Sequence, residues 1–294
     1  MTTSLRPSVG VPTAISGALD LLDDLADRVD YSVIGPRDSR VHETDTTRFP
    51  FNTICHLERD FGDGRWRGCS GVMVGPVTVL TAAHCLYSHL FRRAPVRIRV
   101  SPGRRDRDTT PYGTIDASRG YVPRAYLALR RTRGRSPRDY DYGVLRLGRA
   151  PAGIERFMTV RALSDDELDR IRRTKLVTIA GYPGDRPVGT MWRHTERLTG
   201  TTRHRLFYTV DTCPGHSGSP IWFRSRQAGE RVIIGIHTSG VVDEVGRSFG
   251  CSSGTVLAPS TMRNSGVRAT TELLETSHLL DGSGKRLPAM VRVH

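Results

Sequence analysis

The sequence predicts an all-β fold, either a sandwich or a barrel. Short apolar runs recur along most of the chain, and turn residues separate each run from the next. Such spacing is typical of short strands in all-β domains. At 294 residues, the chain is long enough to build one large β domain or two smaller units around a core. The runs are Cys69–Val74, Val77–Ala82, Val96–Val100, Val144–Leu147, Leu176–Ala180, Leu206–Val210 and Val232–Ile236.

Three helices are expected beside the strands. Residues 13–29 place leucine and valine at helical spacing with acidic residues between them, which predicts a short amphipathic helix. A serine–glutamate capping box at 164–167 opens a second helix that runs to about Arg173. A threonine at 270 or 271 is expected to cap a closing helix that ends near Leu280.

The chain carries a formal net charge of +14. Arginine supplies almost all of it, because Lys175 and Lys285 are the only lysines. Arginine binds phosphate well, so nucleic acid is a partner to consider. The basic residues are scattered, however, with local runs only at 97–107 and 130–138, and we find no RNA- or DNA-binding motif. We therefore expect a solvated basic surface, no nucleic-acid partner, and long surface loops in the arginine-rich segment 103–138.

The sequence contains neither a candidate transmembrane helix nor a clear signal peptide. No apolar stretch reaches the length of about 18 residues that a transmembrane helix needs, so no membrane partner is expected. The amino terminus lacks a clear signal peptide, because Arg6 is its only early positive charge and the stretch Val9–Leu22 is broken by proline, glycine and aspartate. The five cysteines are too few to indicate an oxidising compartment by themselves.

Two short segments carry the strongest chemical signal. Thr81–Cys85 ends an apolar run with His84, and Gly215–Pro220 holds Ser217 in a tight turn between glycines. A serine hydroxyl is a weak nucleophile until a nearby base takes its proton. A base and a nucleophile on separate segments therefore predict covalent acyl-transfer catalysis.

A third residue is needed to hold the histidine in the correct tautomer, and a buried carboxylate suits that role. Asp141 is the best candidate, because the strand-like run Tyr142–Leu147 follows it directly. Asp139 is the alternative, although it lies further into the loop. The glycines on either side of Ser217 allow a sharp turn in which the amides of Gly215 and Ser217 form an oxyanion hole.

The order His84, Asp141, Ser217, in these local contexts, resembles the chymotrypsin-like serine proteases. The resemblance implies two antiparallel six-stranded β-barrels with the three residues in the cleft between them. It also implies peptide-bond hydrolysis through an acyl-enzyme, protein or peptide substrates, a monomer, and no metal or organic cofactor.

The match is closer to one branch of that family, the bacterial glutamyl endopeptidases. The segments 181–192 (GYPGDRPVGTMW), 217–220 (SGSP) and 234–237 (IGIH) are similar to signatures of that branch. Val33-Ile34-Gly35-Pro36 resembles its mature amino terminus, and the resemblance covers roughly residues 33–278.

This resemblance divides the chain into three parts. Residues 1–32 form an amino-terminal extension or propeptide, 33–280 the protease domain, and 281–294 a carboxy-terminal tail. The competing interpretation keeps residues 1–32 as a permanent extension.

The resemblance also assigns the cysteines. It implies a bridge between Cys69 and Cys85 beside the histidine, and a second bridge between Cys213 and Cys251 at the wall of the substrate pocket. Cys55 is left over, and we expect a buried free thiol. Paired cysteines favour secretion, whereas the missing signal peptide favours a cytoplasmic location.

Family enzymes that cleave after glutamate bind that side chain with a threonine, a histidine and the mature α-amino group. The matching positions are Thr212, His237 and Val33, which leads to the hypothesis of cleavage after Glu, with Asp slower. Residue 216 is histidine where trypsin-type enzymes carry aspartate, and we expect a partly exposed turn residue. The alternatives are an intracellular regulatory protease of other specificity and a non-catalytic binding module on the same fold.

Overall fold

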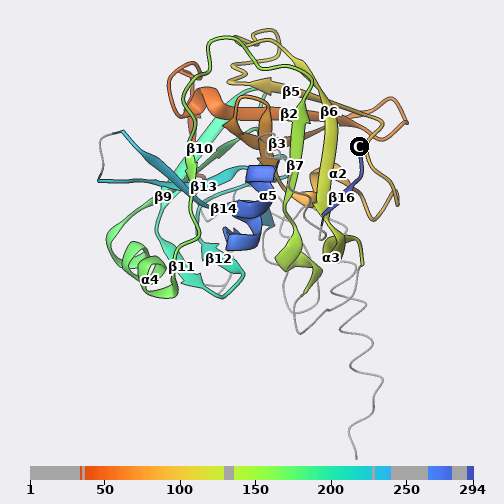
Figure 1. Cartoon of the computed structure of the whole chain (residues 1–294). Coiled ribbons are helices and arrows are strands. Elements are labelled where there is room, and N and C mark those ends of the chain that lie inside the picture. Colours follow the sequence, from red (N-terminus) through yellow and green to blue (C-terminus); the bar gives the residue numbers. More distant parts are fainter. Residues whose placement is uncertain (1–33, 35–36, 129–135, 227–228, 240–263, 280–289) are drawn as a thin grey trace, which may run out of the picture.

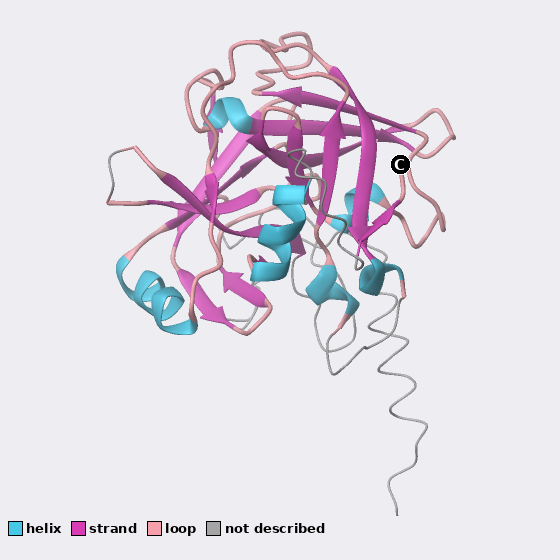
Figure 2. Ribbon diagram, viewed as in Figure 1, coloured by secondary structure: helices cyan, strands magenta, loops and turns pink. Residues whose placement is uncertain are grey.

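The computed structural model describes residues 34, 37–128, 136–226, 229–239, 264–279 and 290–294. Strands dominate it, and the helices are short and lie around them (Figure 2). The predicted all-β class is confirmed. The strands form two separate sheets, which lie side by side (Figure 1).

The first sheet closes into a six-stranded antiparallel barrel, as the resemblance implied. Its strands follow the order β6-β5-β2-β3-β4-β7, and β7 pairs again with β6, which completes the ring. These strands are β2 (Ile54–Asp60), β3 (Trp66–Gly75), β4 (Thr78–Thr81), β5 (Arg97–Pro102), β6 (Ile115–Pro123) and β7 (Gly143–Leu147).

The second sheet has nine described strands in place of the expected six. Its order is β1-β10-β9-β13-β14-β15-β12-β11, and β8 pairs in parallel with β14. The strands are β1 (Val41–Glu43), β8 (Thr159–Val160), β9 (Val177–Gly181), β10 (Met191–Glu196), β11 (Leu198–Thr201), β12 (Arg205–Tyr208), β13 (Pro220–Arg224), β14 (Arg231–Ser239) and β15 (Asn264–Arg268).

Helices occupy the connections. The capping box at Ser164 is present and begins α4 (Asp165–Thr174), as predicted. Thr270 accepts from the Leu273 N–H and begins α5 (Thr271–Leu279), which also matches the prediction. The others are η1 (Phe51–Thr53), α2 (Ala83–Leu86), α3 (Arg124–Leu127) and η2 (Pro137–Tyr140). The predicted helix at 13–29 lies outside the described residues.

Two expectations require correction. The segment 103–138 contains β6 and α3, so it is not loop throughout. A bulge between Ala117 and Arg119 breaks the two-residue alternation by which a strand is recognised in a sequence, and β6 was therefore not predicted. Within the predicted tail 281–294, Met290–Arg292 forms β16 and pairs with β6. This end of the chain is therefore part of the first sheet.

Apolar packing joins the two sheets. One cluster fills the first barrel and another lies within the second sheet. A third cluster takes residues from both, including Val72 and Leu80 of the first and Met191 and Ile236 of the second, with Leu273 of α5. Each buried side chain of this size contributes about 1.5–3 kcal/mol, so the interface between the sheets is held firmly. Among the described residues, no helix is long and apolar enough to span a membrane.

Candidate active site

His84 and Asp141 form a hydrogen-bonded pair beside the first barrel. Strands β4 and β7 pair with Thr81 opposite Gly143, so the residues just after β4 meet those just before β7. Nδ1 of His84 lies 2.7 Å from Oδ2 of Asp141, and the His84 backbone N–H donates to Oδ1 over 2.9 Å. The carboxylate therefore fixes both the backbone and the ring of the histidine.

Asp139, the alternative in the sequence, has a different task. Its carboxylate accepts from the Ser136 N–H over 3.2 Å in the capping box that begins η2. Asp141 is the carboxylate that contacts His84. Burial would raise the pKa of Asp141, but the charge and hydrogen bonds of His84, aided by the charge of Arg205, lower that pKa below its usual value. The carboxylate thus stays ionised at neutral pH.

Ser217 lies in a tight turn between two glycines whose backbone conformations favour glycine. Gly215 has φ +101° and Gly218 has φ +88°, both in the left-handed region. A Cβ on Gly215 would lie 2.5 Å from the carbonyl oxygen of Tyr182. The Oγ of Ser217 is buried and makes no hydrogen bond, either to His84 or to any other residue that the structure describes.

Ser70, on β3, connects this turn to the first barrel. Its Oγ donates to the Gly215 carbonyl over 2.7 Å and accepts from the Tyr182 N–H over 2.9 Å. Its backbone N–H donates to the Ser217 carbonyl over 2.8 Å. Sequence analysis missed Ser70, because a serine inside a predicted strand carries no signal beyond its place next to Cys69.

Two peptide planes in the turn have fixed directions. The Gly184 N–H donates to the Pro214 carbonyl over 2.7 Å, and the Ser219 N–H donates to the carbonyl that precedes Ser217 over 2.9 Å. In a planar trans peptide the N–H points opposite to the carbonyl. These bonds therefore set the directions of the Gly215 and Ser217 amides.

His216 is buried, which corrects the expectation of a partly exposed turn residue. It is 1% exposed, and its Nδ1 accepts from the Cys213 N–H over 3.0 Å. Burial, aided by the charge of Arg40, lowers the pKa of His216 to about 3. The neutral ring is a structural part of the turn.

A pH effect on stability follows. Burial, with the charges of two arginines, also lowers the pKa of His56 to about 3. Both histidines titrate near 6.5 when unfolded, so their contribution is complete above pH 6.5 and is lost as the pH falls toward 3. We expect each to destabilise the fold by about 1.4 kcal/mol per pH unit across that window.

Denaturant unfolding of the Ser217→Ala protein between pH 7 and about 4 measures this slope. His56→Gln with His216→Gln should reduce the slope, while the part that buried His237 contributes remains. An unchanged slope in that double variant would contradict the assignment.

Thr212 precedes the Ser217 turn in the chain, His237 lies on β14, and both are buried. The Gly218 N–H donates to the His237 carbonyl over 2.8 Å, and Tyr208 Oη lies 2.7 Å from His237 Nδ1. Thr212 Oγ1 and His237 Nε2 have no hydrogen-bond partner within the described part of the chain. Burial lowers the pKa of His237 well below its usual value, so the ring is neutral.

The segment that follows Val33 docks beside Thr212. The Ser39 N–H donates to Asp211 Oδ2 over 2.8 Å. The buried guanidinium of Arg40 pairs with Asp38 at 2.8 Å and with Asp185, in the predicted signature segment, at 2.5 Å. Val33 itself lies outside the described residues.

A match to a family model decides the classification. The model described as Trypsin matches residues 40–256, which is most of the chain. The chain belongs to the trypsin family. The first barrel, which carries His84 and Asp141, and the turn that carries Ser217 both fall within the matched range.

The relatives of this trypsin-family chain include glutamyl endopeptidases. That of Bacillus licheniformis is 33% identical over 213 residues, which cover 71% of this chain and 61% of the relative. An extracellular metalloprotease of Bacillus subtilis is 30% identical over 210 residues, which cover 71% of this chain and 63% of that protein. The chain thus spans about three fifths of the length of these relatives.

Solved structures agree with this classification. The structure of a Glu endopeptidase in complex with MPD has a TM-score of 0.63 and 25% identity, and the match covers 83% of this chain and 97% of that one. The resemblance to the glutamyl endopeptidase branch is confirmed.

The cysteines follow the expected arrangement where they are described. Cys69 and Cys85 form a disulfide, and Cys55 is a buried free thiol. Cys213 is also disulfide-bonded, while its expected partner, Cys251, lies outside the described residues.

Within the described ranges, Cys69, His84 and Cys85 are the one group of side chains spaced closely enough to hold a metal ion. Because its two sulfur atoms are bonded to each other, this group offers no thiolate ligands.

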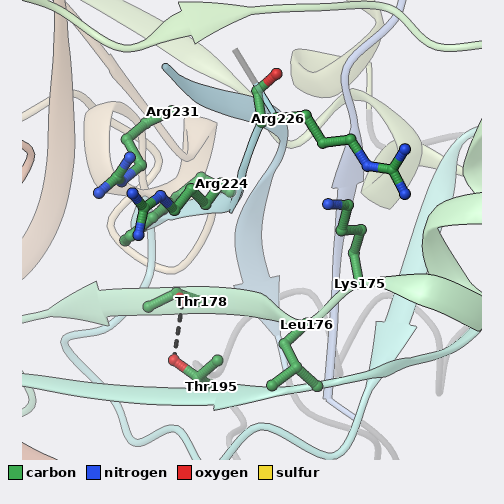
Figure 3. A pocket seen from close by; sticks show the side chains of 9 residues that line it. Lys175, Leu176, Thr178, Thr195, Arg224, Arg226 and Arg231 are labelled. Carbon is green, nitrogen blue, oxygen red and sulfur yellow. Dashed lines mark hydrogen bonds between the residues drawn. The ribbon is translucent and has the colours of Figure 1, made fainter. Parts of the chain in front are cut away.

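A separate hollow of about 390 Å³ lies on the second sheet (Figure 3). Lys175, Arg224, Arg226 and Arg231 line it, and Trp222 lies among them. None of the residues that line this hollow is a predicted site residue.

Proposed function

We propose that this chain is a serine endopeptidase with Ser217 as nucleophile. The observation that carries the proposal is the pair of hydrogen bonds from His84 to Asp141, which fixes the histidine in one orientation. His84 takes the proton from Ser217 as its Oγ attacks the scissile carbonyl. Asp141 holds Nδ1 protonated and stabilises the imidazolium that forms. His84 then gives the proton to the leaving amine.

The attack requires the Ser217 hydroxyl to reach Nε2 of His84. Catalytic hydrogen bonds in unliganded sites are often long and tighten when substrate binds. The amides of Gly215 and Ser217 then hold the oxyanion, and each such donor typically stabilises the transition state by about 3 kcal/mol. Water hydrolyses the resulting acyl-enzyme by the same proton path.

We further propose cleavage after Glu, with Asp slower, at the P1 residue that supplies the scissile carbonyl. Tyr208 Oη lies 2.7 Å from Nδ1 of His237, and we assign the donor role to the Tyr208 hydroxyl. The ring then carries its proton on Nε2 and is a donor to a carboxylate. Thr212 offers a second buried polar group, a hydroxyl. Their unsatisfied buried polar atoms support a pocket whose hydrogen bonds are completed by substrate.

In this proposal, the α-amino group of Val33 completes the pocket for the acidic side chain. Cleavage between Ser32 and Val33 would free that amine, and the docking of Ser39 on Asp211, next to Thr212, supports its arrival near the pocket. Residues 1–32 are then a propeptide, and another protease must remove it, because serine is not the proposed P1 residue. We also propose that the protein is secreted and monomeric.

Hydrolysis of a P1-Glu chromogenic peptide tests the function. The full chain and a chain that begins at Val33 are compared, each with its Ser217→Ala control. We expect activity only in the chain that begins at Val33, lost on Ser217→Ala. Inactivity of both forms toward P1-Glu, P1-Arg and P1-Phe peptides would overturn the proposal and favour the binding module.

A further inference from the structure

Arg205, on β12, places its guanidinium group between η2 and the strands β14 and β15. Nη1 donates to the Arg138 carbonyl over 2.8 Å. Nη2 lies within hydrogen-bond distance of three hydroxyls, at 3.3 Å from Thr238 Oγ1, 3.2 Å from Ser239 Oγ and 2.5 Å from Ser265 Oγ. All four acceptors are uncharged. Among the described residues, Arg205 forms no ion pair with a carboxylate.

These contacts connect η2, which leads into Asp141, to strand β14, which carries His237. Arg138 belongs to η2, and Asp141 is the C-cap residue that directly follows this helix. Thr238 and Ser239 follow His237 directly on β14. On β12 itself, the residue three positions after Arg205 is Tyr208, which contacts Nδ1 of His237.

The charge of Arg205 is therefore felt on both sides. It helps His84 to lower the pKa of Asp141 against the effect of burial, which alone would raise that pKa. It also adds to the burial that keeps His237 neutral. Asp141 and Asp139 interact with this cation through space, but all its hydrogen-bond acceptors are neutral. We infer that a positive potential remains in the interior, where charge interactions act over longer distances than in water. Neither Thr212 nor neutral His237 brings positive charge to the proposed pocket.

We propose that Arg205 is a positioning and specificity-determining residue, whose fixed positive charge favours an acidic P1 side chain over its neutral isostere. The inference rests on the proposed function. Arg205 acts through Tyr208, His237 and the β14 hydroxyls and does not need to touch the substrate. The charge is present whether or not the α-amino group of Val33 is free.

The ratio of kcat/KM for a P1-Glu peptide to that for the matching P1-Gln peptide tests this proposal. Both peptides are measured on one preparation, so the fraction of active protein cancels. We expect Arg205→Gln to lower the ratio by about tenfold, mainly through the Glu peptide, while Arg205→Lys keeps most of it. Arg203→Gln is the control, because Arg203 is exposed two positions earlier and should leave the ratio unchanged.

The outcomes separate the inference from the function on which it rests. A wild-type protein that does not prefer Glu over Gln would overturn the proposed specificity itself. A selective wild type with an unchanged ratio in Arg205→Gln would overturn only the role of Arg205. If Arg205→Gln does not fold, Arg205→Lys decides: a retained ratio supports the role of the charge, and a lost ratio shows that the hydrogen-bond geometry alone matters.

Discussion

Replacement of Ser217 by alanine is expected to lower kcat by about 10⁴- to 10⁶-fold, because no other nucleophile then attacks the scissile carbonyl. The substitution should change the stability of the fold little, since Oγ makes no hydrogen bond within the described residues. Folding is therefore expected to survive. Steady-state hydrolysis of the P1-Glu peptide measures the loss, and thermal unfolding checks the fold.

Ser219 provides the matched control for this variant. It lies in the same turn, is also fully buried, and its Oγ likewise has no partner among the described residues. Ser219→Ala should keep activity within about tenfold of the wild type. A Ser217→Ala protein as active as Ser219→Ala would remove Ser217 from the mechanism.

Replacement of Asp141 by asparagine is expected to lower kcat by about 10⁴-fold. The amide keeps the shape of the side chain but no longer holds Nδ1 of His84 protonated, so Nε2 ceases to be a base. The same variant loses the negative charge that stabilises the imidazolium. The pH dependence of kcat/KM, recorded with wild type and variant, measures both effects.

Asp139→Asn separates this loss from a local structural effect. Asp139 caps η2 through the Ser136 N–H, whereas the hydrogen bonds to His84 come from Asp141. We expect that variant to lose about 1 kcal/mol of stability with kcat nearly unchanged. Equal losses of kcat in the two variants would contradict the role of Asp141, because they would trace the loss to the local structure of the loop and not to the charge of that residue.

Local patterns made much of the fold predictable. The strand runs are bounded by turn residues, and the capping box at Ser164 is a signal complete within four residues. The pairing of His84 with Asp141 could be anticipated because each lies next to a recognisable strand, β4 or β7, and these strands pair directly. The disulfide Cys69–Cys85 followed from the resemblance.

The residues that sequence analysis missed act across long distances in the chain. Ser70 and Gly215 are separated by 145 positions, yet one hydroxyl joins them. Arg205 reaches η2, β14 and β15 at once, and nothing in its neighbours along the chain distinguishes it from the other arginines. His216 was expected in a partly exposed turn, because the packing that buries it comes from other elements.

Covalent labelling with a phosphonate that carries a P1-Glu side chain tests the central claim most directly. Such a reagent is attacked by an activated serine and stays bound to it. For the chain that begins at Val33, mass spectrometry should find one equivalent of label on the peptide that contains Ser217. His84→Ala should abolish the labelling. Label on another residue, or hydrolysis of the P1-Glu peptide by a protein that takes up no label, would contradict the account.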